Sequence, residues 1–348
     1  MKILFNTNYV SAATNIGIDQ MIPKLEAAGH NIKRNDWNNY QNYDLVFFMS
    51  PDSRVAEAKN KNPNILTCII DPKIVSFFDK IKSKTLWKQP IMRELRFADF
   101  LLVSSIEHRD SLLKYNKNPF INYFFPITPK EKKQHTEKKK ITIGYHGNKV
   151  HLDSMADVSW ALDKLSEKYD IEFLAIYNIQ KLGKWVMNRP KKCKVIDTQW
   201  TSDMAEDLRK CDIGVSPSLQ PINIKLGLAF TKYFLNRKFP YSPDDYLFRF
   251  KYSNGPGRLY NFAMLGIPVV ADATPSQCQF IQDEKSGFIC CTKESWYNSL
   301  ERLIGDANLR KMQGENLFNF IENNYSIEKN FERLMGFIND LQSVKKRQ

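Results

Sequence analysis

The feature that most constrains this chain is a repeated alternation of short, continuously apolar runs with segments of helical periodicity. Residues 44–49 and 64–70 contain apolar runs of strand length that end in polar residues. Continuous apolarity, without a polar residue at every second position, is typical of parallel strands covered on both faces. Such runs, alternating with helical segments, predict a doubly wound α/β fold.

The alternation stops once and then restarts. Between its two halves lies a charged stretch, 128–140, in which eight of the thirteen residues are Lys or Glu. A chain of 348 residues is long enough for two α/β domains. We therefore predict four parts: an N-terminal Rossmann-like domain over 1–127, a linker over 128–140, a second Rossmann-like domain over 141–326, and a C-terminal helix with a basic tail over 327–348.

The sequence lacks the patterns typical of membrane-spanning, secreted and metal-binding proteins. No apolar run approaches the roughly 20 residues of a membrane-spanning helix, and Met1–Phe5 enters a strand pattern without a secretory signal. The six cysteines form no C-x-x-C pair, and no Asp-x-Asp cluster is present. We therefore expect a cytoplasmic protein without a bound metal ion.

The formal net charge of +13 points to anionic partners. Such a charge attracts nucleic acid, anionic lipid headgroups or phosphorylated ligands. The densest basic runs lie at 130–133, 138–140 and 345–347. They are interpreted either as solvated surface and linker or as contacts to a membrane surface, and both interpretations stay open. Nucleic-acid binding rests on charge alone, without an aromatic-basic platform or a reading helix, and is not predicted.

The first candidate motif is a glycine-containing turn at the end of the first strand pattern of the second domain. Residues 141–149 read ITIGYHGNK. Gly144 and Gly147 allow a ligand to approach the backbone, and the following helix start offers free N–H groups to an anion. His146 and Lys149 can add donors or charge, and Asn148 completes the turn. An ordinary turn without a ligand is the alternative interpretation.

The second candidate motif spans 251–272, where a Gly/Pro-rich loop enters a short helix and then a buried strand. Arg258 lies in the first turn of this helix, where a cation opposes the helix dipole, so an anionic partner is favoured. Asn261 lies three residues further on the same helical face. Ser216, at the end of the preceding strand pattern, and Asn254, in the loop, complete the predicted ligand-binding set.

The second motif resembles the C-terminal signature of GT-B glycosyltransferases, especially the retaining nucleotide-sugar enzymes of family four and their bacterial relatives. Arg258 matches the basic position of that signature, and residues 266–271, Gly-Ile-Pro-Val-Val-Ala, match its strand. The resemblance covers about 141–335 and is weaker over 1–126. It implies two Rossmann-like domains facing a central cleft, with the C-terminal helix crossing back to the N-terminal domain.

Two positions depart from the family pattern. The family's helix usually carries a Glu that holds the donor ribose, and Asn261 occupies that position. An earlier family Glu would fall at Ser253. A neutral amide binds a hydroxyl more weakly than a carboxylate does. A donor held differently, an unusual nucleotide and loss of activity all remain open.

The resemblance implies transfer of a sugar from a nucleotide-activated donor to a hydroxyl of a glycan or lipid-linked acceptor, in bacterial-type surface polysaccharide or glycoconjugate synthesis. Retention of configuration and independence of metal and resident cofactor are implied with it. The predicted catalytic set is Asp71, His108 and Arg258, since Asp71 and His108 follow buried strands of the acceptor domain. The alternative is a catalytically inactive GT-B-fold nucleotide- or glycan-binding protein in a membrane-associated assembly. A peripheral location at the inner face of the cell membrane is open in both cases.

Overall fold

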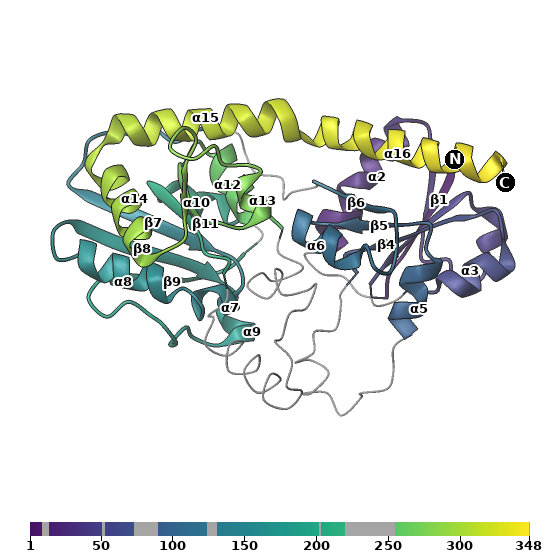
Figure 1. Ribbon diagram of the computed structural model, residues 1–348, viewed down its shortest axis with the longest axis horizontal. Coiled ribbons are helices and arrows are strands. Elements are labelled where there is room, and N and C mark those ends of the chain that lie inside the picture. The colour runs from purple at the N-terminus through teal and green to yellow at the C-terminus, as the bar shows by residue number, and fades with distance from the viewer. Residues whose placement is uncertain are drawn as a thin grey trace, which may run out of the picture. The chain divides into compact units, whose positions relative to one another are not determined.

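The computed structural model of the protein describes residues 1–8, 14–50, 53–72, 90–123, 131–201, 203–219 and 255–347. The chain forms two compact units (Figure 1). Unit 1 combines Met1–Phe125 with Tyr325–Gln348, and unit 2 is Pro126–Asn324. Within the described residues, no helix has the length and apolarity needed to cross a membrane.

Unit 1 is built on a six-stranded parallel sheet with the strand order β2-β1-β3-β4-β5-β6. Its strands are β1 (Lys2–Asn6), β2 (Asn31–Arg34), β3 (Leu45–Met49), β4 (Leu66–Ile70), β5 (Phe100–Val103) and β6 (Pro119–Ile121). Every residue of β3 and β4 is buried, which is why these strands appear in the sequence as continuous apolar runs. The edge strand β6 has three residues, too few for periodicity to predict it.

One face of this sheet is covered by α2 (Met21–Ala27) and by the C-terminal helix α16 (Ile327–Arg347). Leu334 and Ile338 of α16 lie in the same buried core as the side chains of β1 and β3. The Phe337 ring also packs edge-on against Phe100, with ring centroids 5.5 Å apart. The last helix of the chain therefore belongs to the N-terminal unit, because its apolar stripe completes that unit's core. The other helical elements of unit 1 are η1 (Asn15–Asp19), η2 (Tyr40–Asn42), α3 (Val55–Lys61), α5 (Pro90–Phe97) and α6 (Ile106–Leu112).

Unit 2 contains a second six-stranded parallel sheet, with the order β12-β11-β10-β7-β8-β9. Its strands are β7 (Lys140–His146), β8 (Asp170–Tyr177), β9 (Lys194–Gln199), β10 (Ile213–Ser216), β11 (Val269–Asp272) and β12 (Phe288–Cys290). The first strand, β7, lies in the middle; the chain adds β8 and β9 on one side and β10 to β12 on the other. This is the strand order of dinucleotide-binding Rossmann folds. The prediction of two Rossmann-like α/β domains is confirmed.

The helices of unit 2 cover both faces of its sheet. On one face, α8 (Ala156–Leu165) and α14 (Lys293–Gly305) bury apolar side chains that include Leu162 and Leu300. On the other face, α12 (Gly257–Met264) places the Phe262 ring against the glycines of β7 and β10. The remaining helices are α7 (Lys149–Leu152), α9 (Ile179–Leu182), α10 (Ala205–Arg209), α13 (Pro275–Cys278) and α15 (Ala307–Tyr325).

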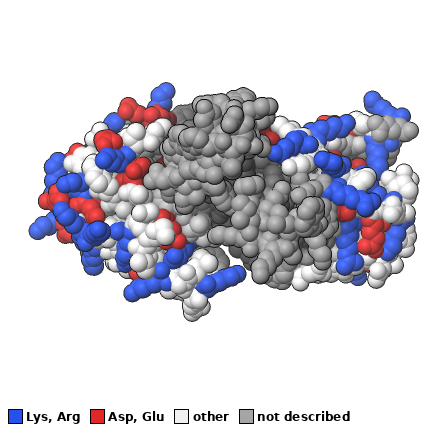
Figure 2. Space-filling view, turned by 60° about the horizontal axis from the view of Figure 1, so that its bottom comes forward, with Lys and Arg blue, Asp and Glu red and all other residues white. Residues whose placement is uncertain are grey.

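The charged stretch predicted as a linker packs on unit 2 over its described part, 131–139, without forming a helix or strand. Lys133 and Lys138 place their ammonium nitrogens 3.2 and 2.6 Å from the carboxylate of Asp212, whose side chain is 2% exposed. Burial lowers the pKa of Lys133, and the charge of Asp212 opposes that shift. These two lysines therefore compensate a buried carboxylate. On the face shown in Figure 2, Lys and Arg side chains of the described residues are dispersed among Asp and Glu.

Candidate functional site

The candidate site lies in unit 2 where β7 and β10 separate. These neighbouring strands pair at Ile143↔Ile213 and Gly144↔Gly214, and their connections then lead to opposite sides of the sheet. In open parallel sheets, ligands bind in the crevice at the carboxyl ends of strands where the strand order reverses. The residues at the carboxyl ends of β7, β10 and β11 are His146, Ser216 and Asp272.

Arg258 reaches this strand edge from the first turn of α12. Its Nη2 donates to the carbonyl oxygen of Pro217 at 3.1 Å and to Ser218 Oγ at 2.8 Å, and its Nε is 3.5 Å from Ser216 Oγ. The guanidinium also lies 5.7 Å from the centre of the Tyr145 ring. These contacts fix a cation at the end of β10, beside the N-terminus of a helix whose dipole also favours anions.

Gly147 brings the first predicted motif into contact with the second. Its φ of +137° is disfavoured for residues with a side chain. A Cβ at this position would lie 3.1 Å from Arg258 Cδ and 3.0 Å from the Tyr145 hydroxyl oxygen. The glycine therefore leaves room for the Arg258 side chain to pass the end of β7. The structure thus brings together two segments that the sequence analysis singled out separately.

His146, the last residue of β7, is 4% exposed. Its Nε2 is 3.1 Å from the carbonyl oxygen of Arg258, to which an Nε2–H group donates, and its ring packs edge-on against Phe262. Burial, followed by the nearby Arg258 charge, lowers the pKa of His146 to about 4, although the hydrogen bond opposes the shift. At neutral pH the predicted phosphate ligand His146 is therefore an uncharged group that positions the start of α12.

The depressed pKa of His146 predicts a pH dependence of stability. Between pH 6.5 and 4 the imidazole of His146 binds a proton in the unfolded chain but not in the folded chain. The contribution of His146 to the free energy of unfolding is therefore complete above pH 6.5 and is lost as the pH falls toward 4. We expect the wild type to lose about 2 kcal/mol more of its free energy of unfolding between pH 7 and pH 5 than His146→Gln does. Urea unfolding at both pH values measures this difference, and equal losses would contradict it.

Three other predicted ligand-binding residues have local structural contacts. Asn148 caps α7, because its Oδ1 accepts from the backbone N–H of Val150 at 3.0 Å. Lys149 forms an ion pair with Asp153 at 2.9 Å. Gly144 lies inside β7, where a Cβ would approach the Sγ of Cys211 to 2.1 Å. These contacts explain the residue types locally, and ligand binding by these residues stays a prediction.

The remaining two predicted donor-binding residues are Asn261 and Asn254, and the structure describes only Asn261. Asn261 lies in α12, one turn after Arg258, and is 1% exposed. It is therefore buried in the packing of α12, and ligand binding by Asn261 stays a prediction. Asn254 lies outside the described residues.

Two further side chains at this strand edge were assigned no role from the sequence. The Asp272 carboxylate accepts from the backbone N–H groups of Ser218 at 2.6 Å and Leu219 at 2.8 Å, and from Trp296 Nε1 at 3.2 Å. Burial raises the pKa of Asp272, although these hydrogen bonds oppose the rise. Gln277 Nε2 donates to the Ser216 carbonyl oxygen at 2.9 Å and to Ser218 Oγ at 2.7 Å.

Asp272 and Gln277 therefore hold the segment 216–219, in which Arg258 contacts the Pro217 carbonyl oxygen and the Ser218 hydroxyl. The position of Asp272 at the end of a buried parallel strand was a usable signal, because strand ends at this edge are where ligand sites form. Gln277 carried no comparable signal in the sequence.

The predicted acceptor-side residues lie in unit 1. Asp71 follows β4 with a φ of +47°, and its N–H donates to the Leu102 carbonyl oxygen at 2.9 Å. His108 lies in the first turn of α6 and is 1% exposed. Its Nε2 is 2.7 Å from the Pro72 carbonyl oxygen, and its Nδ1 is 3.4 Å from the Ser104 backbone nitrogen. The His108 ring thus links the segments that follow β4 and β5, through the Pro72 carbonyl oxygen and the Ser104 backbone nitrogen.

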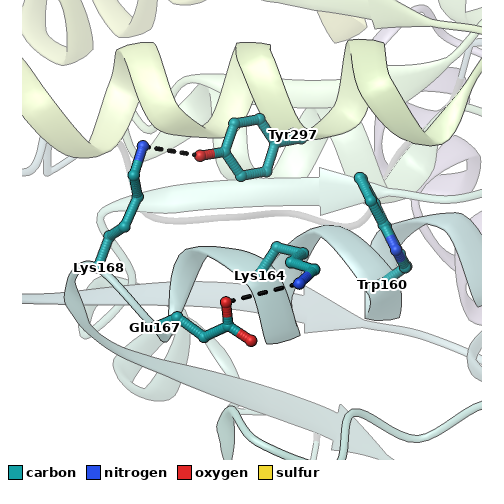
Figure 3. A pocket seen from close by; sticks show the side chains of 5 residues that line it. All are labelled: Trp160, Lys164, Glu167, Lys168 and Tyr297. Atoms are coloured by element: carbon teal, nitrogen blue, oxygen red, sulfur yellow. Dashed lines mark hydrogen bonds and ion pairs between the residues drawn. The ribbon is translucent and has the colours of Figure 1, made fainter.

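A pocket of about 300 Å³ lies elsewhere in unit 2, between α8 and α14. Figure 3 shows its lining: Trp160, Lys164, Glu167, Lys168 and Tyr297. It is formed by the helices that cover the sheet and does not include the strand ends. Within it, Lys168 Nζ is 3.1 Å from the Tyr297 hydroxyl oxygen and Lys164 is 3.6 Å from Glu167. We therefore place the candidate site at the strand ends, where Arg258 and the α12 N-terminus converge.

No group of His, Cys, Asp or Glu suited to a metal ion occurs among the described residues.

No family model and no curated protein sequence matches the chain. Solved structures do match it. HepE from Anabaena in complex with UDP and glucose aligns over 98% of this chain and 100% of HepE, with a TM-score of 0.61 and 12% identity. WaaG, a glycosyltransferase involved in lipopolysaccharide biosynthesis, aligns over 95% of this chain and 98% of WaaG, with a TM-score of 0.55 and 11% identity.

A mutant of S. aureus TarM in complex with fondaparinux, alpha-GlcNAc-glycerol and UDP aligns over 85% of this chain, with a TM-score of 0.56 and 14% identity. The alignment covers 55% of TarM, so this chain matches about half of that protein. These likenesses show that the chain has the GT-B fold of two Rossmann-like domains.

Proposed function

We propose that the protein is a glycosyltransferase that moves a sugar from a nucleotide-activated donor to a hydroxyl of a glycan or lipid-linked acceptor. The donor's phosphates bind in unit 2 where β7 and β10 separate. The proposed setting is synthesis of a surface polysaccharide or glycoconjugate, in the cytoplasm or at the inner face of the membrane. Retention of configuration and activity without a metal ion belong to the proposal through the family resemblance.

The observation that carries this proposal is the position of Arg258. Its guanidinium lies at the end of β10, its main chain forms the start of α12, and Gly147 gives it room beside β7. A leaving nucleoside diphosphate gains negative charge during sugar transfer. A fixed cation and a helix N-terminus stabilise that charge more in the transition state than in the substrate, and so accelerate the reaction. The UDP and glucose in the HepE complex support a nucleotide-sugar as the class of donor.

The acceptor side of the proposal rests on unit 1. Asp71 is the proposed contact to an acceptor hydroxyl, and His108 bonds to the carbonyl oxygen of the following residue, Pro72. The alpha-GlcNAc-glycerol of the TarM complex and the role of WaaG in lipopolysaccharide biosynthesis support a glycan acceptor.

A second candidate function is a nucleotide- or glycan-binding protein without catalysis. It is motivated by Asn261, which stands where the family carries a Glu. Nucleotide binding without transfer or hydrolysis from any common nucleotide-sugar would favour this function over the transferase.

The proposal is tested by a thermal-shift panel of UDP, GDP, CMP, ADP and their sugars. A nucleotide present at 100 times its Kd should stabilise the folded chain by about 2.7 kcal/mol. The corresponding sugar nucleotide should then support release of the nucleotide when an acceptor glycan is added. Absence of stabilisation by every nucleotide would show that the donor site is wrongly assigned.

A further inference from the structure

The loop 183–192 of unit 2 carries the two most exposed large hydrophobic side chains among the described residues. Val186 is 77% exposed and its neighbour Met187 is 64% exposed. Leu182, at the end of α9 just before the loop, is 38% exposed. Single exposed apolar residues are common, but a consecutive pair at the tip of a loop presents a compact apolar surface to a partner.

The tip is held in place by buried anchors on both sides. Trp185 is 1% exposed; its backbone N–H donates to the Tyr177 hydroxyl at 2.9 Å, and its Nε1 donates to the Met187 carbonyl oxygen at 2.6 Å. Arg189 forms two bonds of 2.9 Å to the Asp197 carboxylate. The apolar pair is thus presented by a loop whose conformation is already fixed, which lowers the entropic cost of binding.

Asn188 adds a second attachment on the other side of the tip. It adopts a φ of +52°, and its Nδ2 donates to the carbonyl oxygen of Asp153 at 2.7 Å. Ser159 Oγ donates to the Asn188 carbonyl oxygen. The loop is therefore bonded to the end of α7 and to α8 as well as to the strands, and the exposure of its tip is not the result of a loose segment.

Lysines flank the apolar tip in the sequence. Lys181, Lys184 and Lys191 are exposed, and none of the three forms an ion pair within the part of the chain that the structure describes. By contrast, Lys192 and Lys194 are paired with Glu167 and Glu172. The charge next to the tip is therefore available to an anionic partner.

We propose that the 183–192 loop docks unit 2 on an anionic lipid surface. Val186 and Met187 enter the interfacial region of the bilayer, and Lys181, Lys184 and Lys191 lie among the headgroups. A small exposed apolar tip with lysines nearby in the sequence suits a bilayer, where shallow insertion and electrostatic attraction act together. A stable protein partner requires an interface of roughly 1,000 Å² or more, much larger than this tip.

Membrane docking by the 183–192 loop is a property beyond the proposed sugar transfer. Only the advantage of docking for the reaction rests on the proposed function. The helix α9 follows β8, and α7 follows the neighbouring β7, so the loop begins at the same edge of the sheet as the candidate site (Figure 1). Its tip stays near this edge, since Trp185 bonds to Tyr177 at the end of β8 and Asn188 bonds to Asp153. Docking through this edge would bring a donor site close to a lipid-linked acceptor.

The test is sedimentation of the full chain with vesicles of phosphatidylcholine alone and of equimolar phosphatidylcholine and phosphatidylglycerol. We expect binding to the mixed vesicles only. The double variant Val186→Ser, Met187→Ser should lower the partition coefficient roughly tenfold. Lys184→Gln, Lys191→Gln should lower it roughly 25-fold, because each lysine near an anionic surface contributes roughly fivefold.

Matched controls separate the loop from general surface properties. Val344→Ser, Met312→Ser removes apolar residues that are 54% and 46% exposed on α16 and α15. Lys117→Gln, Lys311→Gln removes the same charge from other exposed positions. We expect both controls to bind like the wild type.

Three results would overturn the proposal: no binding to mixed vesicles, wild-type binding by the two loop variants, or equal losses in the controls. All variants should keep the wild-type unfolding temperature, since the altered side chains project into solvent. They should also keep nucleotide-induced stabilisation. If nucleotides fail to stabilise the wild type, that result counts against the assignment of the donor site and not against membrane docking.

Discussion

Arg258→Gln is expected to lower the rate of sugar transfer roughly 100- to 1000-fold, the range seen when one preorganised electrostatic donor is removed from an active site. The substitution keeps a polar side chain near Ser218 but removes the charge that lies at the end of β10. It should also abolish most of the stabilisation by the donor nucleotide, because the charge is proposed to contact the phosphates in both the bound and the reacting state. Rate measurements and thermal shifts on the same preparation check both effects.

Two comparisons make the Arg258 result interpretable. Arg302→Gln removes a surface arginine of the same unit that pairs with Glu284 at 2.9 Å, and it should leave rate and nucleotide binding unchanged. Arg258→Lys keeps the charge but loses the planar guanidinium, whose Nη2 contacts Pro217 and Ser218 while its Nε lies 3.5 Å from Ser216 Oγ, so it should restore binding only in part. A fully active Arg258→Gln variant would remove Arg258 from the mechanism.

Gly144→Ala is expected to destabilise unit 2 by about 3 kcal/mol, at the upper end for overpacking in a rigid core. The new Cβ would lie 2.1 Å from Cys211 Sγ and 2.9 Å from Cys211 Cβ. Neither atom can move easily, since Cys211 is fully buried two residues before β10 and Gly144 is paired with Gly214 in the sheet. Urea unfolding measures the loss.

A second background separates the steric cause of this destabilisation from any effect of Gly144→Ala on strand propensity. In a Cys211→Ala background the closest contact is gone, so Gly144→Ala should cost at least about 1 kcal/mol less than in the wild type. Gly305→Ala introduces a Cβ with nothing within 4 Å and should not destabilise the chain. An equal cost of Gly144→Ala in both backgrounds would mean that Cys211 is not the obstacle.

The architecture could be predicted from the sequence because it depends on patterns that are local in the chain. The buried strands β3 and β4 appear as unbroken apolar runs, and Leu334 and Ile338 repeat at helical spacing along α16. The edge strand β6 escaped prediction because three residues, one of them proline, carry no periodicity.

The candidate site could be predicted only in part, because its properties arise between distant segments. Arg258 and Gly147 were recognisable as residue types, but their contact depends on the packing of α12 against β7. The charge state of His146 follows from its burial, which no local pattern shows. Asp272 holds Ser218, a residue 54 positions earlier, and the sequence does not show which loop a strand-end carboxylate will bind.

The central claim is that a donor nucleotide binds in unit 2 where β7 and β10 separate. Hydrogen exchange of the full chain, with and without the nucleotide that gives the largest thermal shift, tests it most directly. We predict slower exchange in peptides covering 145–150, 216–219 and 256–260, and no such change in Arg258→Gln. Protection confined to other strands of unit 2 or to unit 1, or equal protection in wild type and variant, would contradict the claim.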